Sequence, residues 1–341
     1  MLGLQDVLVA QHNLSGLITR TPLEYSFLLS QQVGCQVYLK LENWQKTGSF
    51  KVRGAINKVS SLTEEEKARG LVTASAGNHA LGVAYTARAL GNVPTTVFVP
   101  VNAPTSKLKK LEEFDCHVLL SGNSYEEAHH AAEDFGRLHG ATYIHAYDDP
   151  RIIAGQGTIG LEVLEDLPEA DAILVPVGGG GLIAGVAVAA KAINPQVRVI
   201  GVQPEASPSA YLSLRDGRPY EEYDAAPTIA DGLAGGFGRL PFEIAGDLID
   251  EIVLVSEEEM RAAVFTLLEL AQLVVEGSGA VGIAALLAGR VELAGRKVVA
   301  VLTGANIDAS LLFEIMGEHA AKRKKNARVS RFTFHALTGA R

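Results

Sequence analysis

The residue whose type and position most clearly suggest reactivity is Lys51, which follows Thr47-Gly48-Ser49-Phe50. Residues 37–42 alternate as a strand does, Thr47-Gly48 predicts a turn, and Ser49 is a good N-cap for a following helix. Lys51 would lie in the first turn of that helix, where the helix dipole disfavours a second positive charge. A neutral lysine attacks carbonyl carbons, so a nucleophile is predicted here; a solvated surface lysine is the alternative.

A run of four glycines, 178–181, lies between a predicted strand and a predicted helix. Bare backbone N–H groups next to a helix N-terminus form a phosphate cradle, although a tight turn would also use glycine. A dinucleotide site competes with this interpretation, because Gly179, Gly181 and Ala184 fit G-x-G-x-x-[GA] and Glu205 follows about 20 residues later. That match is weak, because Pro204 directly follows the next strand and the motif lies in the middle of the chain.

A second strand-to-helix turn is formed by Ser75-Ala76-Gly77-Asn78-His79. Its N–H groups and the side chains of Ser75 and Asn78 could bind a carboxylate or a phenolic oxygen. Taken alone, such a turn is more often a capped helix start, and His79 is more often structural than catalytic. The pair His129-His130 has no evident ligand partners in the sequence and is interpreted as surface.

Small residues also end two later core elements, in Glu276-Gly-Ser-Gly-Ala280 and Thr303-Gly-Ala-Asn306. Ligands of open α/β sheets bind beyond the carboxyl ends of the strands. The helix of Lys51, Ser75, Gly178 and Thr303 are all predicted at or just past such ends. Four independent turns that meet at one edge indicate a binding site more strongly than any one of them does.

The elements that must position these turns alternate between short strands and helices, which predicts parallel sheets with right-handed crossovers. Asp148-Asp149-Pro150 interrupts the alternation and is a candidate domain boundary. A loop region rich in proline and glycine is expected over residues 204–242. The predicted strands are 37–42, 71–75, 95–100, 117–121, 142–147, 172–177, 197–202, 252–255 and 297–302. The predicted helices are 4–18, one beginning near Lys51, one opened by the capping box Thr63 to Glu66, 78–90, 105–114, 124–139, 152–167, 182–193, 256–275 and 280–288.

The composition of the chain argues against several classes of protein. The chain has 341 residues, is 48% hydrophobic and carries a net charge of −9, which argues against binding to nucleic acid or an anionic membrane. Two cysteines, Cys35 and Cys116, are too few for a disulfide framework, so reduced thiols and a cytoplasmic location are expected. No signal peptide is evident. The uncharged stretch 172–190 is broken by Pro176 and the glycine run, so it is interpreted as a buried strand, loop and helix.

The run from Lys40-Leu41-Glu42-Asn43 through Thr47-Gly-Ser-Phe-Lys51-Val-Arg53-Gly-Ala55 resembles the serine/threonine dehydratase family of fold-type II pyridoxal-phosphate enzymes. The other three turns and the glycine run match that family in the same order. The resemblance, which covers about residues 15–315, implies two open, mainly parallel sheets with flanking helices and a small domain inserted in a large one. The implied divisions are 1–48 plus 149–320 for the large domain, 49–148 for the small domain and 321–341 for a basic C-terminal tail.

The resemblance also implies roles for individual residues. Lys51 would form the Schiff base with pyridoxal 5′-phosphate and later remove the Cα proton of the substrate. The carboxylate of an amino-acid substrate would be bound by Ser75, Ala76, Asn78 and His79. The cofactor would be bound by Phe50, Lys51, Asn78, Gly178, Gly179, Gly180, Gly181, Leu182, Glu276 and Thr303.

The implied reaction is the conversion of L-threonine and L-serine to a 2-oxo acid and ammonia in a homodimer or homotetramer. Serine racemases of this pattern carry a second serine at position 76, so Ala76 favours dehydration. Relatives with a divalent ion use acidic residues where this chain has Gln203 and Ser209, so no metal is expected, although Glu205 could substitute for them. The chain is too short for the regulatory domain of feedback-inhibited enzymes. Another β-hydroxy amino acid, a racemase and a nucleotide-binding oxidoreductase are the alternatives.

Overall fold

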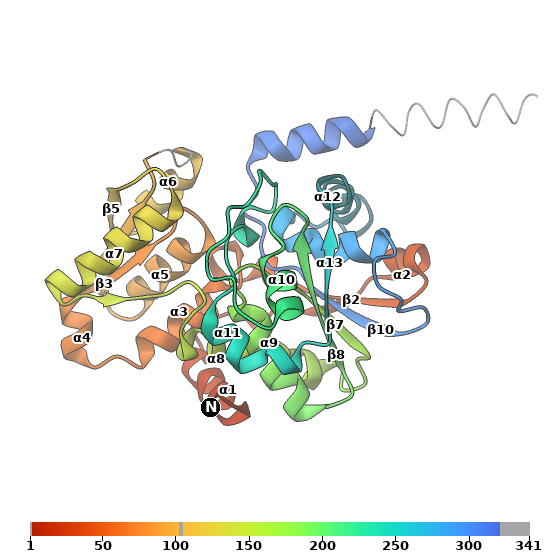
Figure 1. Ribbon diagram of the computed structural model, residues 1–341, viewed down its shortest axis with the longest axis horizontal. Helices are drawn as coiled ribbons and strands as arrows, with labels where there is room; N and C mark the ends of the chain where they lie inside the picture. The colour runs from red at the N-terminus through yellow and green to blue at the C-terminus, as the bar shows by residue number, and fades with distance from the viewer. Residues whose placement is uncertain (1, 102–104, 321–341) are drawn as a thin grey trace, which may run out of the picture.

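Two sheets with flanking helices stand side by side in the molecule, the smaller on the left in Figure 1 and the larger on the right. The structure, a computed structural model, describes residues 2–101 and 105–320. The larger sheet has the strand order β1-β2-β10-β7-β8-β9, and the smaller has the order β5-β4-β3-β6. Strand β1 is antiparallel to β2, and the other described pairs are parallel. The predicted pair of mainly parallel sheets is confirmed.

The strands are β1 Leu23–Tyr25, β2 Gln36–Lys40, β3 Leu71–Ala74, β4 Thr95–Val99, β5 His117–Leu120, β6 Thr142–Tyr143, β7 Ala172–Pro176, β8 Arg198–Pro204, β9 Glu251–Val255 and β10 Lys297–Val301. The α-helices are α1 Leu4–Leu14, α2 Phe27–Val33, α3 Lys51–Ser60, α4 Glu64–Arg69, α5 Asn78–Ala89, α6 Thr105–Glu112, α7 Tyr125–His139, α8 Pro150–Asp166, α9 Gly181–Ile193, α10 Ser209–Asp216, α11 Arg239–Ala245, α12 Glu257–Ala271 and α13 Gly277–Leu287. Short 3₁₀ helices are η1 Glu42–Trp44, η2 Lys46–Gly48, η3 Asp231–Leu233 and η4 Gly246–Leu248. Residues 309–320 are also helical.

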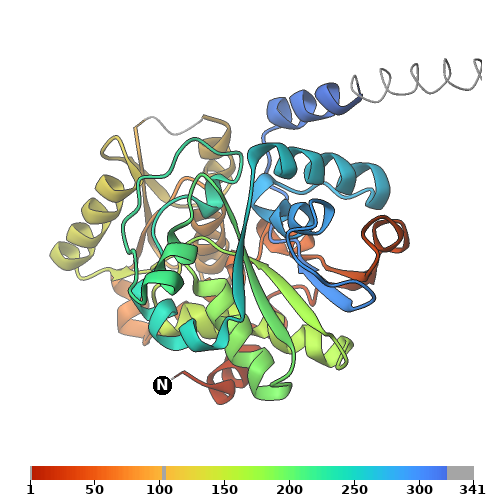
Figure 2. The same ribbon diagram turned by 45° about the vertical axis from the view of Figure 1, so that its right-hand side comes forward.

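The larger sheet is covered on both faces, and its central strands are therefore continuous apolar runs. Every residue of β7 is buried, and so are the last four residues of β10. One core cluster joins the sheet to α2, α12 and α13, and a second joins it to α8, α9 and α11. Figure 2 shows these helices on either side of the sheet. A strand that must bury both faces has no alternation, which is why these segments were recognisable as core.

Helices α5 and α7 cover the smaller sheet. Helix α7 begins after Ser124, whose hydroxyl accepts a hydrogen bond from the N–H of Glu127. The predicted capping box at the start of α4 is present, with reciprocal bonds between Thr63 and Glu66. Such caps satisfy N–H groups that the first helical turn leaves without partners.

Several sequence predictions about elements were wrong in detail. Ser49 is not the N-cap of α3; Phe50 occupies that position without a side-chain cap, and Ser49 forms an isolated bridge with Gly304 instead. Strand β6 is shorter than predicted, because the chain leaves the sheet after Tyr143. Helix α12 stops at Ala271, since Gln272 adopts a left-handed conformation with φ of 55°. The region 204–242 is not only loop, since α10 and part of α11 lie within it.

Strands β3, β7 and β10 end at Ala74, Pro176 and Val301, each just before one of the turns singled out in the sequence. The carboxyl ends of both sheets therefore carry the candidate residues, as expected for open α/β sheets. Within the described ranges, no helix is both long and apolar enough to cross a membrane. The predicted basic tail, 321–341, lies outside the described residues.

Candidate active site

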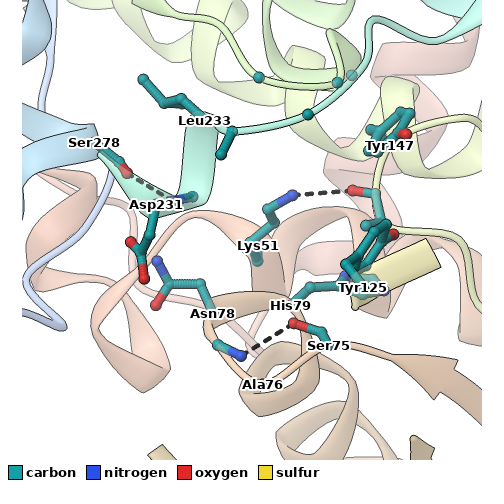
Figure 3. Close-up of a pocket in the computed structure, with 18 of the residues that line it drawn as sticks. Lys51, Ser75, Ala76, Asn78, His79, Tyr125, Tyr147, Asp231, Leu233 and Ser278 are labelled. Carbon is teal, nitrogen blue, oxygen red and sulfur yellow. Dashed lines mark hydrogen bonds between the residues drawn. The ribbon is translucent and has the colours of Figure 1, made fainter. Parts of the chain in front are cut away.

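A cavity of about 1090 Å³ lies where the carboxyl ends of the two sheets meet. Figure 3 shows Lys51 near its centre, with side chains from both sheets around it. The sequence-predicted residues come together here. The cavity is lined by Phe50, Lys51, Ser75, Ala76, Asn78, His79, Gly178, Gly179, Gly180, Gly181, Leu182, Glu276 and Thr303.

Lys51 is the first residue of α3, and its amine points into the cavity. Its Nζ donates a hydrogen bond to the carbonyl oxygen of Ala146 at 3.1 Å and lies 5.3 Å from the centre of the Phe50 ring. Burial lowers the pKa of Lys51 to about 8, although the negative charge of Glu276 opposes this shift. The direction agrees with the sequence prediction, but the main cause is loss of water rather than the helix dipole. Far more of this lysine is therefore the neutral nucleophile near neutral pH than of an ordinary lysine.

The glycine run forms the turn between β7 and α9, at the N-terminus of that helix. Gly180 has φ of 95°, and a Cβ atom there would overlap the ring of Phe237 and lie 2.7 Å from Cβ of Pro241. A Cβ atom on Gly179 would overlap the ring of Tyr147. Only glycine fits these positions, and the first turn of α9 leaves its N–H groups free to bind an anion. The turn therefore has the chemistry of a phosphate cradle.

The turn after β3 brings Ser75, Asn78 and His79 to the cavity. Oγ of Ser75 accepts a hydrogen bond from the N–H of Gly77 at 3.1 Å, which rigidifies the turn. The ring of His79 is buried, and its Nε2 lies 3.0 Å from the carbonyl oxygen of Ile144, to which it can only donate. Burial lowers the pKa of His79 to about 3, so this imidazole is neutral and offers an anion no charge. Only its backbone remains for carboxylate binding.

A chain of hydrogen-bonded amide and carboxylate groups links the turn after β3 to the turns after β10 and before α13. Nδ2 of Asn78 donates to Glu276 at 2.7 Å, and Oδ1 of Asn78 accepts from Nδ2 of Asn306 at 2.7 Å. Thr303 is buried beside them, and its carbonyl oxygen accepts a hydrogen bond from the N–H of Phe50 at 3.1 Å. The turns after β10 and before α13 therefore hold the residues next to Lys51 in place.

The sequence interpretation missed an aromatic wall made by the segment 143–148 and the start of α7. His129 is not simply a surface residue: it is half-buried, lines the cavity, and its Nδ1 lies 2.5 Å from the hydroxyl of Tyr143. Tyr147 packs edge-on against His145 and also lies against the glycine run. Burial raises the pKa of Tyr147 to about 12, so its hydroxyl stays protonated. The position of Tyr147 at the end of a predicted strand was the available signal.

The residues present fit pyridoxal phosphate. The glycine cradle leaves no room for a Cβ atom, as a phosphate site built from backbone amides requires. Lys51 supplies an amine of lowered pKa in the same cavity, as an aldehyde cofactor requires. No group of three or more His, Cys, Asp or Glu side chains suited to a metal ion occurs in the described ranges.

Three comparisons place this geometry among known proteins. The family model described as "Pyridoxal-phosphate dependent enzyme" matches residues 14–304. The chain is 48% identical to L-threonine ammonia-lyase of Thermotoga maritima, over 97% of this chain and 82% of that protein. It is 42% identical to the catabolic L-threonine dehydratase TdcB of Escherichia coli K12, over 93% of this chain and 96% of that protein. The solved structure of maize serine racemase has a TM-score of 0.85 at 34% identity and covers 94% of this chain and 99% of that one.

Proposed function

The chain belongs to the family of pyridoxal-phosphate dependent enzymes, and from this premise we propose that it is an ammonia-lyase that converts L-threonine and L-serine to a 2-oxo acid and ammonia. One observation carries the proposal: the amine of Lys51 and the bare amides of residues 178–181 line the same cavity. A cofactor with an aldehyde at one end and a phosphate at the other needs both features together. The names of two similar relatives support L-threonine as a substrate.

In this proposal the cofactor supplies an electron sink for the pair of electrons left when the Cα proton departs. Lys51 first binds the cofactor through its amine and then accepts the Cα proton of the substrate. Its pKa of about 8 suits a base that must give up and receive protons near neutral pH. With the proton that Lys51 has accepted, the β-hydroxyl would leave as water, and the remaining enamine would take up one water to give the 2-oxo acid and ammonia.

In this proposal the turns around Lys51 orient the substrate and the cofactor. The backbone amides of Ser75, Ala76, Asn78 and His79, together with the side chains of Ser75 and Asn78, would bind the substrate carboxylate. The glycine run and Leu182 would hold the phosphate of the cofactor, and Phe50 would lie beside its ring. Thr303 would help to hold the cofactor ring, while Glu276 holds Asn78 in place through the 2.7 Å bond.

Dehydration is favoured over racemisation because position 76 is alanine. A racemase needs a second acid–base group on the other face of the substrate, and a methyl group carries no exchangeable proton. Serine racemase activity is therefore expected to be minor, although a serine racemase is among the similar structures. Another β-hydroxy amino acid, such as 3-hydroxyaspartate or phenylserine, stays a second candidate substrate. The oxidoreductase alternative is set aside, because the chain belongs to a different family.

An ammonia-release screen of purified protein over threonine, serine, 3-hydroxyaspartate and phenylserine tests the proposal. L-Threonine is expected to give the highest kcat/KM, and the protein is expected to show a visible cofactor band that borohydride removes. Lys51→Ala should abolish both the band and threonine turnover, because the other described lysine that lines the cavity, Lys110, is exposed and donates its amine to Asn306. Full activity in Lys51→Ala, or no ammonia from any hydroxy amino acid, would contradict the proposal.

Several further expectations belong to this proposal. The name of the Escherichia coli relative supports a catabolic enzyme, and insensitivity to isoleucine stays a prediction. Assembly into a homodimer or homotetramer, a cytoplasmic location and the division into domains 1–48 plus 149–320 and 49–148 stay predictions. The absence of a metal requirement is also a prediction, and assays with and without chelator test it.

A further inference from the structure

Three charged residues of the Lys51 motif point away from the cavity and have no part in the proposed chemistry. Lys40, Glu42 and Arg53 are each 0% exposed. They meet Glu162 of α8, which is 5% exposed, in the interior of the molecule. Two positive and two negative side chains are thus enclosed together, and Arg53 lies two residues from Lys51 on α3. We call these four residues the buried charge cluster.

The buried charge cluster is fully hydrogen-bonded. Arg53 forms paired bonds of 2.8 Å with both carboxylate oxygens of Glu42 and bonds of 2.7 and 2.9 Å with both oxygens of Glu162. Its Nη1 also donates to the hydroxyl of Thr158 at 3.0 Å. Lys40 donates to Glu162 at 2.5 Å. Burial opposes the charge of Glu162, but Arg53 and then Lys40 outweigh it and hold its pKa below the ordinary value. The carboxylate of Glu162 is therefore charged in the folded protein and pairs with Arg53 and Lys40.

The cluster connects both ends of the segment that carries Lys51 to the same side chain, Glu162 on α8. Lys40 ends β2, Arg53 lies in the first turn of α3, and both bind Glu162 on α8. The two 3₁₀ helices and Lys51 lie between them. Helices α3 and α8 also pack backbone to backbone, since a Cβ atom on Gly155 would lie 2.7 Å from the carbonyl oxygen of Arg53. A shift of α3 along α8 would therefore break the arginine bonds, and the bonds fix the position of α3.

Stability alone does not account for this arrangement. Taking four charges out of water is costly, and well-packed apolar side chains of similar volume would stabilise a core at least as well. Charged groups instead restrict the relative positions of the side chains, because a planar guanidinium with paired bonds to two carboxylates has a single good orientation. We propose that the buried charge cluster is a positioning device that sets the place of Lys51 in the cavity, with Arg53 as its central residue. This inference rests on the proposed role of Lys51.

The substitution Arg53→Lys tests the inference, because it keeps the charge and removes the paired geometry. Two quantities are measured well below the unfolding midpoint of each variant. One is kcat and KM for L-threonine per cofactor-loaded site, and the other is the rate at which apoenzyme captures pyridoxal 5′-phosphate, followed by the visible band. Both kcat and the capture rate should fall about tenfold to a hundredfold, as misplacement by an ångström does, while KM stays within about twofold.

Lys58→Met is the matched control. Lys58 also lies on α3 and forms an ion pair of 2.6 Å with Asp149, at the start of α8, so it joins the same two helices away from Lys51. This variant should lose some thermal stability and keep the wild-type kcat and capture rate within about twofold. If Arg53→Lys likewise loses only stability and keeps both rates, the cluster is merely structural and the inference is wrong.

Thr158→Val is the second variant, for the case in which Arg53→Lys does not fold. It removes one bond to the guanidinium and leaves all four charges in place. Its capture rate should fall about threefold or more, as expected for loss of one hydrogen bond to a charged group, and an unchanged rate overturns the inference.

The capture measurement uses no amino acid. It therefore distinguishes failure of the positioning role from failure of the proposed threonine reaction, in which the band would form normally and no ammonia would appear.

Discussion

At the scale of single residues, the reactivity of Lys51 is set by what surrounds its amine. Burial lowers the pKa of Lys51 to about 8, and the charge of Glu276 moves it partly back. The neighbouring imidazoles add no charge, because burial lowers the pKa of both His79 and His145 to about 3. The pKa of this lysine is thus set by its removal from water and by the nearby carboxylate of Glu276. Burial and neighbouring charges are two of the main causes of pKa shifts in proteins.

The pH dependence of cofactor capture follows from this balance. The neutral amine is the reactive form, so the capture rate of apoenzyme should rise with pH through a midpoint near 8, rather than near the ordinary lysine value of 10.5. Glu276→Gln removes the charge that raises this pKa, so the midpoint should move below that of the wild type. Rapid-mixing absorbance across the pH range measures it.

Glu24→Gln is the control for that measurement, since Glu24 is an exposed carboxylate on β1 and does not line the cavity. Its midpoint should equal the wild-type value. A midpoint that stays the same or rises in Glu276→Gln would contradict the assigned electrostatics.

At the scale of secondary-structure elements, the glycine turn before α9 does what no other residue type could do there. Its backbone approaches Tyr147 on one side and Phe237 on the other, and Gly180 has a left-handed conformation. The same turn exposes the free N–H groups of a long buried helix. Close packing and anion binding thus require the same bare backbone.

Gly180→Ala should weaken cofactor binding strongly. The added methyl group would overlap Phe237, and a left-handed conformation costs alanine about 1–2 kcal/mol by itself. We expect the dissociation constant for pyridoxal 5′-phosphate to rise more than about tenfold. Equilibrium titration of apoenzyme measures this. Gly217→Ala is the control, since Gly217 has φ of 67° with open space around it, so it should lose stability without loss of affinity.

The start of α8 illustrates a purely structural use of a carboxylate. Asp149 caps this helix through bonds of 2.7 and 3.2 Å to the N–H groups of Arg151 and Ile152, and it also pairs with Lys58. Asp149→Ala should lower the free energy of unfolding by about 1–2 kcal/mol, whereas Lys58→Met should lower it by less than about 1 kcal/mol. Urea unfolding gives both values. Equal losses would show that the cap contributes nothing beyond the ion pair.

At the scale of the whole molecule, the cavity depends on contacts between the two sheets, seen side by side in Figures 1 and 2. Asn306, in the loop after β10, donates to the carbonyl oxygen of Thr47 at 2.9 Å and to Asn78 at 2.7 Å. It also accepts a bond from Lys110 of α6 at 2.8 Å. One amide therefore joins the edge of the larger sheet to two helices of the smaller one.

Asn306→Ala should loosen this junction. We expect faster hydrogen exchange at the first turn of α5 and a KM for L-threonine about fivefold higher, as loss of roughly one net hydrogen bond predicts. Lys110→Ala removes only the exposed bond and should change KM by less than about twofold. If Asn306→Ala leaves both exchange and KM unchanged, the junction does not hold the site closed.

The sequence predicted most of the fold and the positions of the main site residues. Strands β7 and β10 were recognisable because both faces are buried, and their apolar runs have no other use. The capping box at Thr63 was recognisable because its partners are three residues apart. By contrast, α10 and α11 were missed, because the prolines and glycines around them are typical of loop and only tertiary packing selects a helix there.

By itself, the sequence determined the residue types at each turn, and with them the amine, the bare amides and the small groups at the strand ends. Local patterns could carry this information, because each turn needs only its own few residues. Only the tertiary structure decided that Arg53 meets Glu162, 109 residues away, that Tyr147 lies against the glycine run, and that His129 lines the cavity. Such contacts depend on how two sheets pack together, and no local pattern encodes the distance between residues so far apart in the chain.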